Sequence, residues 1–236
     1  MGGASGAEGV TGVNGAGVGA VGEGADGAGE GGLTLRERKK RRTRQRISGE
    51  ATRLFIERGF DQVTVAEIAR AAEVSTMTVF NYFPRKEDLF LDRIPEAGEL
   101  IVRAIRGRGP DETPLDALRR LGRDLLAERH PLAGVGEGFA HFWRTVVESS
   151  ALRARGREAI EELEGLLAAE LARASGDDGP EPRLSAALIV GGWRAVYAEA
   201  LARQLDGDPV DAVAVDYAEA LERTFDALER ALPVLR

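Results

Sequence analysis

The chain of 236 residues contains no cysteine. This absence excludes disulfide bonds, thiolate zinc sites and cysteine nucleophiles, and it is consistent with a reducing compartment. No apolar run approaches the roughly 20 residues that a membrane-spanning helix needs. The N-terminus also lacks a basic stretch followed by an apolar one, so it offers no secretory signal. We therefore expect a soluble protein of the cytoplasm.

Residues typical of catalytic sites are equally scarce. The two histidines, His130 and His141, are too far apart for a His-Glu-x-x-His site, and neither a Gly-x-Ser-x-Gly elbow nor a phosphate-binding loop is present. A Gly-x-Gly-x-x-Gly match at residues 17–22 lies in glycine-rich sequence without a preceding strand, so we read it as chance. Arginines and glutamates at residues 153–164 fit a solvated helix face. We expect no enzyme, no cofactor and no metal site.

The net charge of −7 is unevenly distributed. Residues 36–93 hold 14 Lys or Arg against 9 Asp or Glu, including all three lysines, whereas the segments on either side are acidic. Charge asymmetry of this kind indicates a polyanionic partner for one part of the chain only.

Glycine divides the chain into parts. Residues 1–32 hold 14 of the 30 glycines, and their only large apolar side chains are Met1 and valines. Such sequence cannot offset its chain entropy, so we predict a disordered tail over residues 1–34. A DNA-binding domain is then expected at 35–95, and a second domain at 96–236.

Apolar residues recur at helical spacing after the tail. The first predicted helix, from about residue 36 to 58, carries an apolar stripe and ends at Gly59; its stripe is Ile47, Ala51, Leu54 and Phe55. Thr64 and Glu67 form a capping box that predicts a second helix. Ser75 is a good N-cap for a third, which ends before Pro84. A fourth is expected to hold Leu89, Phe90 and Ile94 and to be closed by Pro95.

Longer helices are predicted between breakers in the remaining chain, at about 114–128, 138–149, 151–174, 183–205 and 210–231. Valine and threonine do not alternate over a length that suggests a sheet. The predicted fold class is all-α.

The segment 64–83, TVAEIARAAEVSTMTVFNYF, carries the functional signal. Two short helices joined by a tight turn at Glu73 and Val74 predict a helix-turn-helix, whose second helix enters the major groove of DNA. The Thr-x-x-x-Ile-Ala start, the Val-Ser turn, Thr-Val-Phe-x-Tyr-Phe and the following Lys-Glu-Asp-Leu resemble the TetR family of bacterial regulators over roughly residues 44–91. That resemblance implies an N-terminal three-helix DNA-binding domain and a larger helical domain for ligand binding and dimerisation.

The resemblance also suggests roles for single residues. The predicted DNA-contacting residues are Thr64, Ser75, Thr76, Met77, Thr78, Phe80, Asn81, Tyr82 and Lys86. The first residues of the recognition helix reach base edges, and Tyr82 and Lys86 resemble the family's phosphate contacts. Simpler roles are a plain helix cap for Thr64 and solvated surface for Met77, Asn81 or Lys86. Val79 and Phe83 are expected in the core, against Ile68 and Phe55.

Three positions depart from the family pattern. Glu73 stands where a glycine is common, so either the turn keeps a negative φ or it is strained. Met77 replaces a small residue, and Phe80 replaces a tyrosine and its hydroxyl. These departures leave the operator sequence open.

A basic run at residues 36–46 holds eight bases and one acid. It abuts the predicted DNA-reading helices, so it is expected to follow phosphates or to enter the minor groove. Such an arm adds affinity more than sequence choice.

The helical domain is expected, by resemblance, to supply a dimer interface and a ligand site. Helices at about 183–205 and 210–231 carry apolar stripes that could pair with a second subunit or face their own core; the stripes are Leu184, Leu188, Val196, Leu201, Val213, Tyr217, Leu221, Phe225, Leu228 and Leu232. Candidate ligand contacts, which could equally be plain core, are Phe139, His141, Phe142, Trp143, Trp193 and Tyr197.

The resulting hypothesis is a homodimeric repressor that a small molecule releases from a palindromic operator. Two alternatives remain open from the residues alone. One is a regulator of the same fold that activates or answers no ligand, and the other is a helical interaction module that has lost DNA binding.

Overall fold

The computed structural model describes residues 34–232, and within them the only regular elements are helices. The predicted tail lies outside the described residues, apart from Thr34, which caps the first helix. None of the helices in the described range is both long and apolar enough to cross a membrane. The all-α prediction is confirmed.

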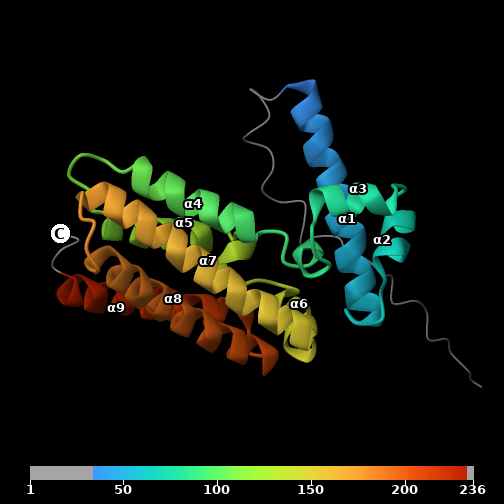
Figure 1. The fold of residues 1–236 in the computed structure, drawn as a ribbon. Helices are drawn as coiled ribbons and strands as arrows, with labels where there is room; N and C mark the ends of the chain where they lie inside the picture. Colours follow the sequence, from blue (N-terminus) through green and yellow to red (C-terminus); the bar gives the residue numbers. More distant parts are fainter. Residues whose placement is uncertain (1–33, 233–236) are drawn as a thin grey trace, which may run out of the picture.

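The head of the molecule begins with α1 (Leu35–Arg58), which is followed by the short α2 (Val65–Ala71) and α3 (Thr76–Tyr82). Gly59 ends α1 with φ at 85°, a conformation that favours glycine. The core between these helices holds the predicted residues Ile47, Phe55 and Ile68, all fully buried. Figure 1 shows α1 passing behind α2 and α3 and extending well beyond them.

The segment after α3 differs from its prediction. Leu89 belongs to a short 3₁₀ turn, η3 (Glu87–Leu89), and Ile94 begins a new helix, α4 (Ile94–Arg106), instead of ending one. Pro95 lies in the first turn of α4, where a missing N–H costs no helical hydrogen bond. Pro95 was predicted to end a helix, but it lies at the start of α4, and α4 itself was not predicted.

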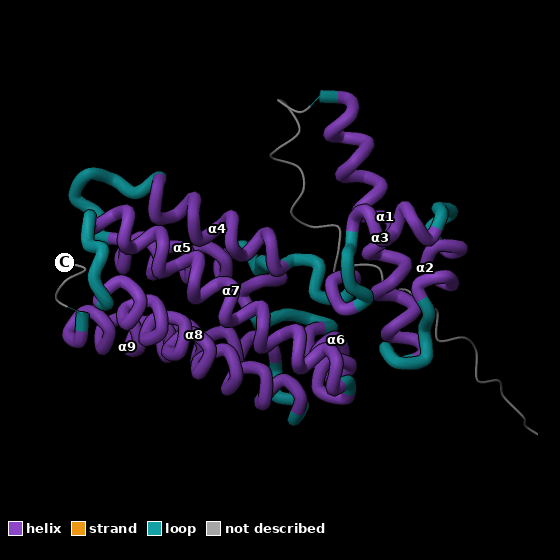
Figure 2. The backbone as a smooth tube through the Cα atoms, in the orientation of Figure 1, coloured by secondary structure: helices purple, strands orange, loops and turns teal. Residues whose placement is uncertain are grey.

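In the described chain the body consists of α4 and the helices that follow it: α5 (Pro114–Ala127), α6 (Phe139–Glu148), α7 (Ser150–Ser175), α8 (Glu181–Leu205) and α9 (Val210–Ala231). A 3₁₀ turn, η4 (Pro131–Ala133), lies between α5 and α6. The bounds of α5 to α9 confirm the five predicted ranges to within two residues. Helix α8 packs between α7 and α9, and α5 closes the core against α9 (Figures 1 and 2). Helix α6 lies at the end of the body nearest the head (Figure 2).

Candidate DNA-binding surface

Helix α2 begins with the predicted capping box. The Thr64 hydroxyl accepts from the Glu67 N–H at 3.3 Å, and a Glu67 carboxylate oxygen accepts from the Thr64 N–H and hydroxyl, each at 2.8 Å. The hydrogen bond from the Thr64 N–H, more than any other contact, lowers the pKa of Glu67 to about 2. Thr64 is thus confirmed as a cap. A phosphate at this position would have to replace an anionic carboxylate.

The turn between α2 and α3 is tight and strained. Glu73 has φ of 52°, so of the two predicted alternatives the strained one holds. The Val74 N–H donates to the Ala69 carbonyl at 2.9 Å, which fixes the turn despite the unfavourable side chain.

Helix α3 is fixed to the head from one side. Ser75 caps it by accepting from the Thr78 N–H at 3.0 Å, and the two hydroxyl oxygens lie 2.7 Å apart. Val79 and Phe83 point inward and are buried with Ile68 and Phe55, as predicted. With this side held by the core, the opposite side of α3 is presented to solvent.

The exposed side of α3 carries the predicted base-reading residues. Thr76 and Asn81 are exposed, as are the large apolar side chains of Met77, 69 % exposed, and Phe80, 45 % exposed. The Asn81 side chain has no hydrogen-bond partner among residues 34–232. Exposed apolar surface beside an amide with free donors and acceptors suits the floor of a major groove, which offers thymine methyl groups and adenine edges.

The two predicted phosphate contacts differ in whether their side-chain polar groups are already hydrogen-bonded. Tyr82 is half-buried at the end of α3, and its hydroxyl has no partner within the described range. The Lys86 ammonium instead donates to the Phe60 carbonyl at 2.6 Å and lies 4.2 Å from the Phe60 ring centroid. Burial lowers the pKa of Lys86. Because an ammonium has three donors, a phosphate could still bind it, but Lys86 also holds the head together.

Sequence reasoning missed Arg44. Its guanidinium donates to the Tyr82 carbonyl at 3.0 Å and to the Asp92 carbonyl at 3.1 Å, and it lies 4.2 Å from the centroid of the Phe83 ring. Arg44 therefore ties α1 to the end of α3. Nothing within the basic run distinguishes this arginine from its neighbours, since its hydrogen-bond partners lie 38 and 48 residues away in the chain.

Comparison with known proteins identifies the architecture. Residues 47–92 match the sequence model described as bacterial regulatory proteins, tetR family. The HTH-type transcriptional regulator TcmR of Streptomyces glaucescens is 35 % identical over 198 residues, which cover 81 % of this chain and 86 % of that protein. The chain belongs to the TetR family. It is accordingly a DNA-binding transcriptional regulator and not an enzyme.

Other known proteins are similar to this chain in sequence over a shorter stretch, or in fold alone. The HTH-type regulator HbdR of Aromatoleum sp. (strain CIB) is 44 % identical over 46 residues, about 20 % of either chain. The SmeT–triclosan complex has a TM-score of 0.54 at 17 % identity, over 79 % of this chain and 91 % of that one. NalD of Pseudomonas aeruginosa, the secondary repressor of the MexAB-OprM multidrug efflux pump, has a TM-score of 0.51 at 21 % identity, over 79 % and 96 %. These two structures share the TetR fold.

The TetR-type head is joined to the body by rings and ion pairs. The Phe90 ring stacks on Phe142 of α6 at 4.3 Å between centroids. Arg155 of α7 pairs with Asp88 at 2.8 Å, and its side chain is only 12 % exposed. The prediction of a solvated face at residues 153–164 is therefore wrong for Arg155. The error arises because the partner, Asp88, lies on a distant part of the chain.

Four of the six candidate ligand contacts form one cluster between α6 and α8. Trp143 and Tyr197 lie edge to face at 5.7 Å between ring centroids, and Phe139 lies 5.8 Å from Tyr197. Phe142 joins the cluster through Trp143 at 5.8 Å. Burial raises the pKa of the Tyr197 phenol, and the neighbouring Trp143 indole partly offsets that rise. The buried Trp143 N–H makes no well-formed hydrogen bond to another described residue. The cluster thus holds two polar groups, the Trp143 N–H and the Tyr197 hydroxyl, inside an aromatic wall.

The other two candidates lie elsewhere. His141 is on the exposed side of α6. Trp193 belongs to the core between α5, α8 and α9, where its N–H donates to the Tyr217 hydroxyl at 3.2 Å and its ring meets Phe225 at 5.9 Å. Helical spacing alone could not separate these two residues from the cluster.

Proposed function

We propose that this TetR-family regulator is a homodimeric repressor that leaves a palindromic operator when a small molecule binds its helical body. The observation that carries the proposal is the exposed side of α3. Its unpaired amide and apolar side chains are mounted on a buried core, as a base-reading helix requires. A chain that reads bacterial DNA acts in the cytoplasm, which we propose as its location.

Helix α8 supports the dimer. Residues 184, 188, 191, 195, 198 and 202 follow one another at alternating spacings of four and three, and we call them the α8 strip: Leu184, Leu188, Gly191, Ala195, Ala198 and Ala202. Leu184 is 52 % exposed and Leu188 is 42 % exposed. An exposed strip of small and apolar residues at this spacing is suited to pairing with an antiparallel or parallel copy of itself.

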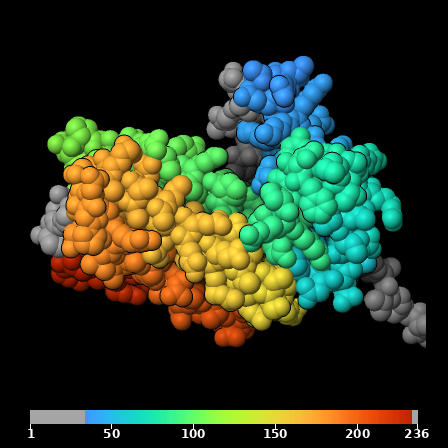
Figure 3. Space-filling view, viewed as in Figure 1, coloured from blue at the N-terminus to red at the C-terminus, as the bar shows by residue number. Residues whose placement is uncertain are grey.

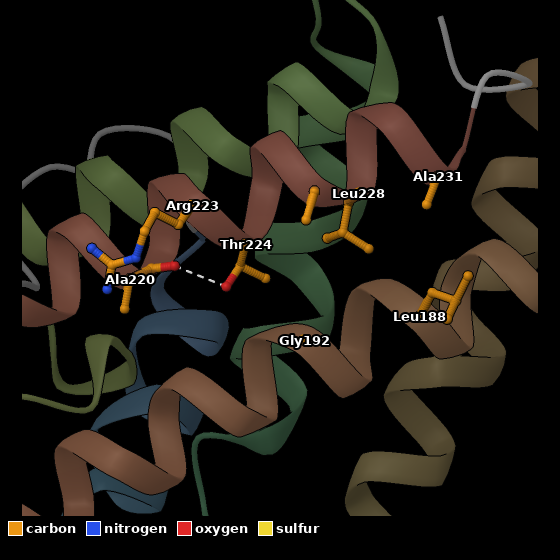
Figure 4. Close-up of a pocket in the computed structure, with 8 residues that line it drawn as sticks. Leu188, Gly192, Ala220, Arg223, Thr224, Leu228 and Ala231 are labelled. Atoms are coloured by element: carbon orange, nitrogen blue, oxygen red, sulfur yellow. Dashed lines mark hydrogen bonds between the residues drawn. The ribbon is translucent and has the colours of Figure 1, made fainter.

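Helix α9 continues this surface. Next to Leu188 an open groove of about 480 Å³ runs between α8 and α9, with small residues on both walls (Figure 4). Gly192 permits the close approach, because a Cβ there would lie 2.8 Å from the Thr224 methyl carbon. The predicted α9 stripe from Val213 to Leu232 faces the chain's own core instead. We therefore place the dimer contact on the α8 strip and on the α9 residues that line this groove.

Two copies explain sequence selection. A single seven-residue recognition helix touches few base pairs, whereas two heads related by a two-fold axis read two half-sites. The operator expected for such a dimer is a palindrome.

Ligand release is supported by a continuous series of ring contacts. Phe55 of α1 meets Phe90 at 5.6 Å, Phe90 stacks on Phe142, and Phe142 leads to Trp143 and Tyr197. A molecule that enters the aromatic cluster has to move one of these rings, and the stack passes that movement to the head. The SmeT–triclosan complex, which shares this fold, contains a bound small molecule.

The decisive experiment selects binding sites for the purified chain from random duplex DNA and then titrates the winner at several salt concentrations. A palindromic winner that binds two chains with a steep salt dependence is the expected result. Binding without sequence preference at any salt concentration would contradict the proposal and favour an interaction module.

A further inference from the structure

The first three turns of α1 form a basic arm, which we define as residues 35–46. Seven of its cations make no ion pair and no side-chain hydrogen bond within residues 34–232: Arg36, Arg38, Lys39, Lys40, Arg41, Arg42 and Arg46. Glu37 is the one acid of the arm, and it is engaged in the capping box with Thr34. The arm therefore concentrates positive charge that nothing in the described chain neutralises.

This charge is unfavourable for the arm as a free helix. Cations three and four residues apart repel one another, and they lie at the helix N-terminus, where the macrodipole is already positive. Apart from Leu35, the first ten residues of the arm carry no large apolar side chain that could compensate by packing. A polyanion on the surface of the arm removes both penalties.

The position of the arm next to α3 identifies the polyanion. Arg44 hydrogen-bonds the carbonyl of Tyr82, the last residue of α3, so the C-terminal end of the arm lies beside the recognition helix. Figure 3 shows the N-terminal part of α1 projecting from the surface of the head. The arm is about 18 Å long, which corresponds to about five base-pair steps of a DNA strand. It can thus reach phosphates beyond the bases that α3 touches.

The shape of the arm decides between the two predicted modes of contact. Residues 35–46 are helical, and a helix with its side chains is about 10–12 Å wide, whereas the minor groove of B-DNA is only about 6 Å wide. A helix of this width lies along the backbone and does not enter the minor groove as an extended segment does.

We propose that the arm is a second DNA-binding surface, which binds the phosphate backbone of the duplex flanking each half-site without regard to its sequence. The inference rests on the proposed DNA-reading function, but it assigns the flank to residues that precede the family match at 47–92. The arm raises affinity and salt dependence, while α3 chooses the bases.

A charge-matched pair of triple variants tests the proposal. The arm variant carries Arg38→Gln, Lys39→Gln and Arg42→Gln, which keep good helix propensity. The control carries Arg103→Gln, Arg144→Gln and Arg157→Gln, which remove three exposed cations of the body that also lack ion pairs in the described range. Both are titrated, at several salt concentrations, on two duplexes: the selected site alone, and the same site extended by one helical turn, about 10 base pairs, on each side.

On the extended duplex, the arm variant should lose about 0.9 in the slope of log affinity against log salt for every phosphate contact removed. On the short duplex it should match the wild type within about twofold, and the control should match it on both. Selected sequences should not change, and the thermal midpoints should not fall.

Three results would overturn the inference: equal losses on both duplexes, an unchanged slope on the extended one, or a changed selected sequence. If no sequence is selected but the arm variant still weakens binding to long random duplex, the proposed repressor function fails and the arm's DNA contact stands.

Discussion

The basic arm and the helical body hold their cations in opposite ways. In the body, Arg119 of α5 lies within 4 Å of three carboxylates on α9, and Arg106 binds Glu170 at 2.5 Å. In the arm, seven cations have no such partner within the described residues. The body is held together from within, whereas the arm is arranged for a counter-charge that another molecule supplies.

The same contrast holds for apolar side chains. Within the described chain, four of the seven large exposed apolar residues lie on α3 and on the α8 strip, two on each. On α3 they stand beside a basic arm, which points to DNA. On α8 they stand among alanines and glycines, which points to protein. Unsatisfied groups thus mark two surfaces with two different partners.

The largest effect is expected from charge placed on the α8 strip. Leu184→Glu with Leu188→Glu would bury four carboxylates at a two-fold interface without counter-ions, a cost of several kcal/mol. We expect the dissociation constant of the dimer to rise at least about 100-fold. Sedimentation velocity over a range of protein concentrations measures this change.

Val147→Glu is the matched control for that variant. Val147 is another large apolar side chain exposed to solvent, but it lies on α6 outside the groove of Figure 4. It should leave the dissociation constant unchanged. Equal effects of the two substitutions, or a dimer that survives both charges in the strip, would place the interface elsewhere.

Substitutions in α3 are expected to have a smaller effect on free energy, because each side chain contacts only one base position per half-site. Asn81→Ala and Met77→Ala remove largely exposed side chains, so the thermal midpoint should change little. Each should relax the preference at one position per half-site, a loss of about 1–3 kcal/mol where the contact is good. Repeating the site selection with each variant measures the change. Identical selected sites would contradict the proposed docking of α3.

Local patterns predicted most of the fold. The capping residues Thr64 and Ser75 and the apolar stripe of α1 act over a few residues, so the sequence displays them directly. The start of α4 was misread because a proline is compatible with both the end of one helix and the first turn of the next, and only packing decides between them.

For the same reason, the exposed side of α3 could be predicted from the sequence, whereas contacts between distant parts of the chain could not. The exposed side of α3 follows from the residues that its buried side contains. The side chains of Arg44, Arg155 and Lys86 bind partners that lie 26 to 67 residues away in the chain, and no local pattern contains these partners. The sequence likewise could not show that Trp193 lies apart from the aromatic cluster of α6 and α8. Its position depends on which neighbouring helix each face of α8 contacts.

The mildest test sharpens the contrast within the body, at Glu170. Hydrogen bonds from Arg106, more than those from Arg173, lower its pKa from 4.5 to about 2. A depressed carboxylate pKa stabilises the fold above the unfolded value of about 4.5, and that stabilisation disappears as the pH falls towards 2. Because both arginines are largely exposed, we expect Glu170→Gln to lower the free energy of unfolding by only about 1 kcal/mol near pH 7. Urea denaturation at several pH values should show this difference shrinking below about pH 4.

Glu161→Gln is the control, because Glu161 is an exposed carboxylate without an ion pair in the described chain. This variant should show no difference from the wild type at any pH. A deficit of Glu170→Gln that persists at the acid end would mean that Glu170 acts through packing, and the ion pairs would then not be what distinguishes the body from the arm.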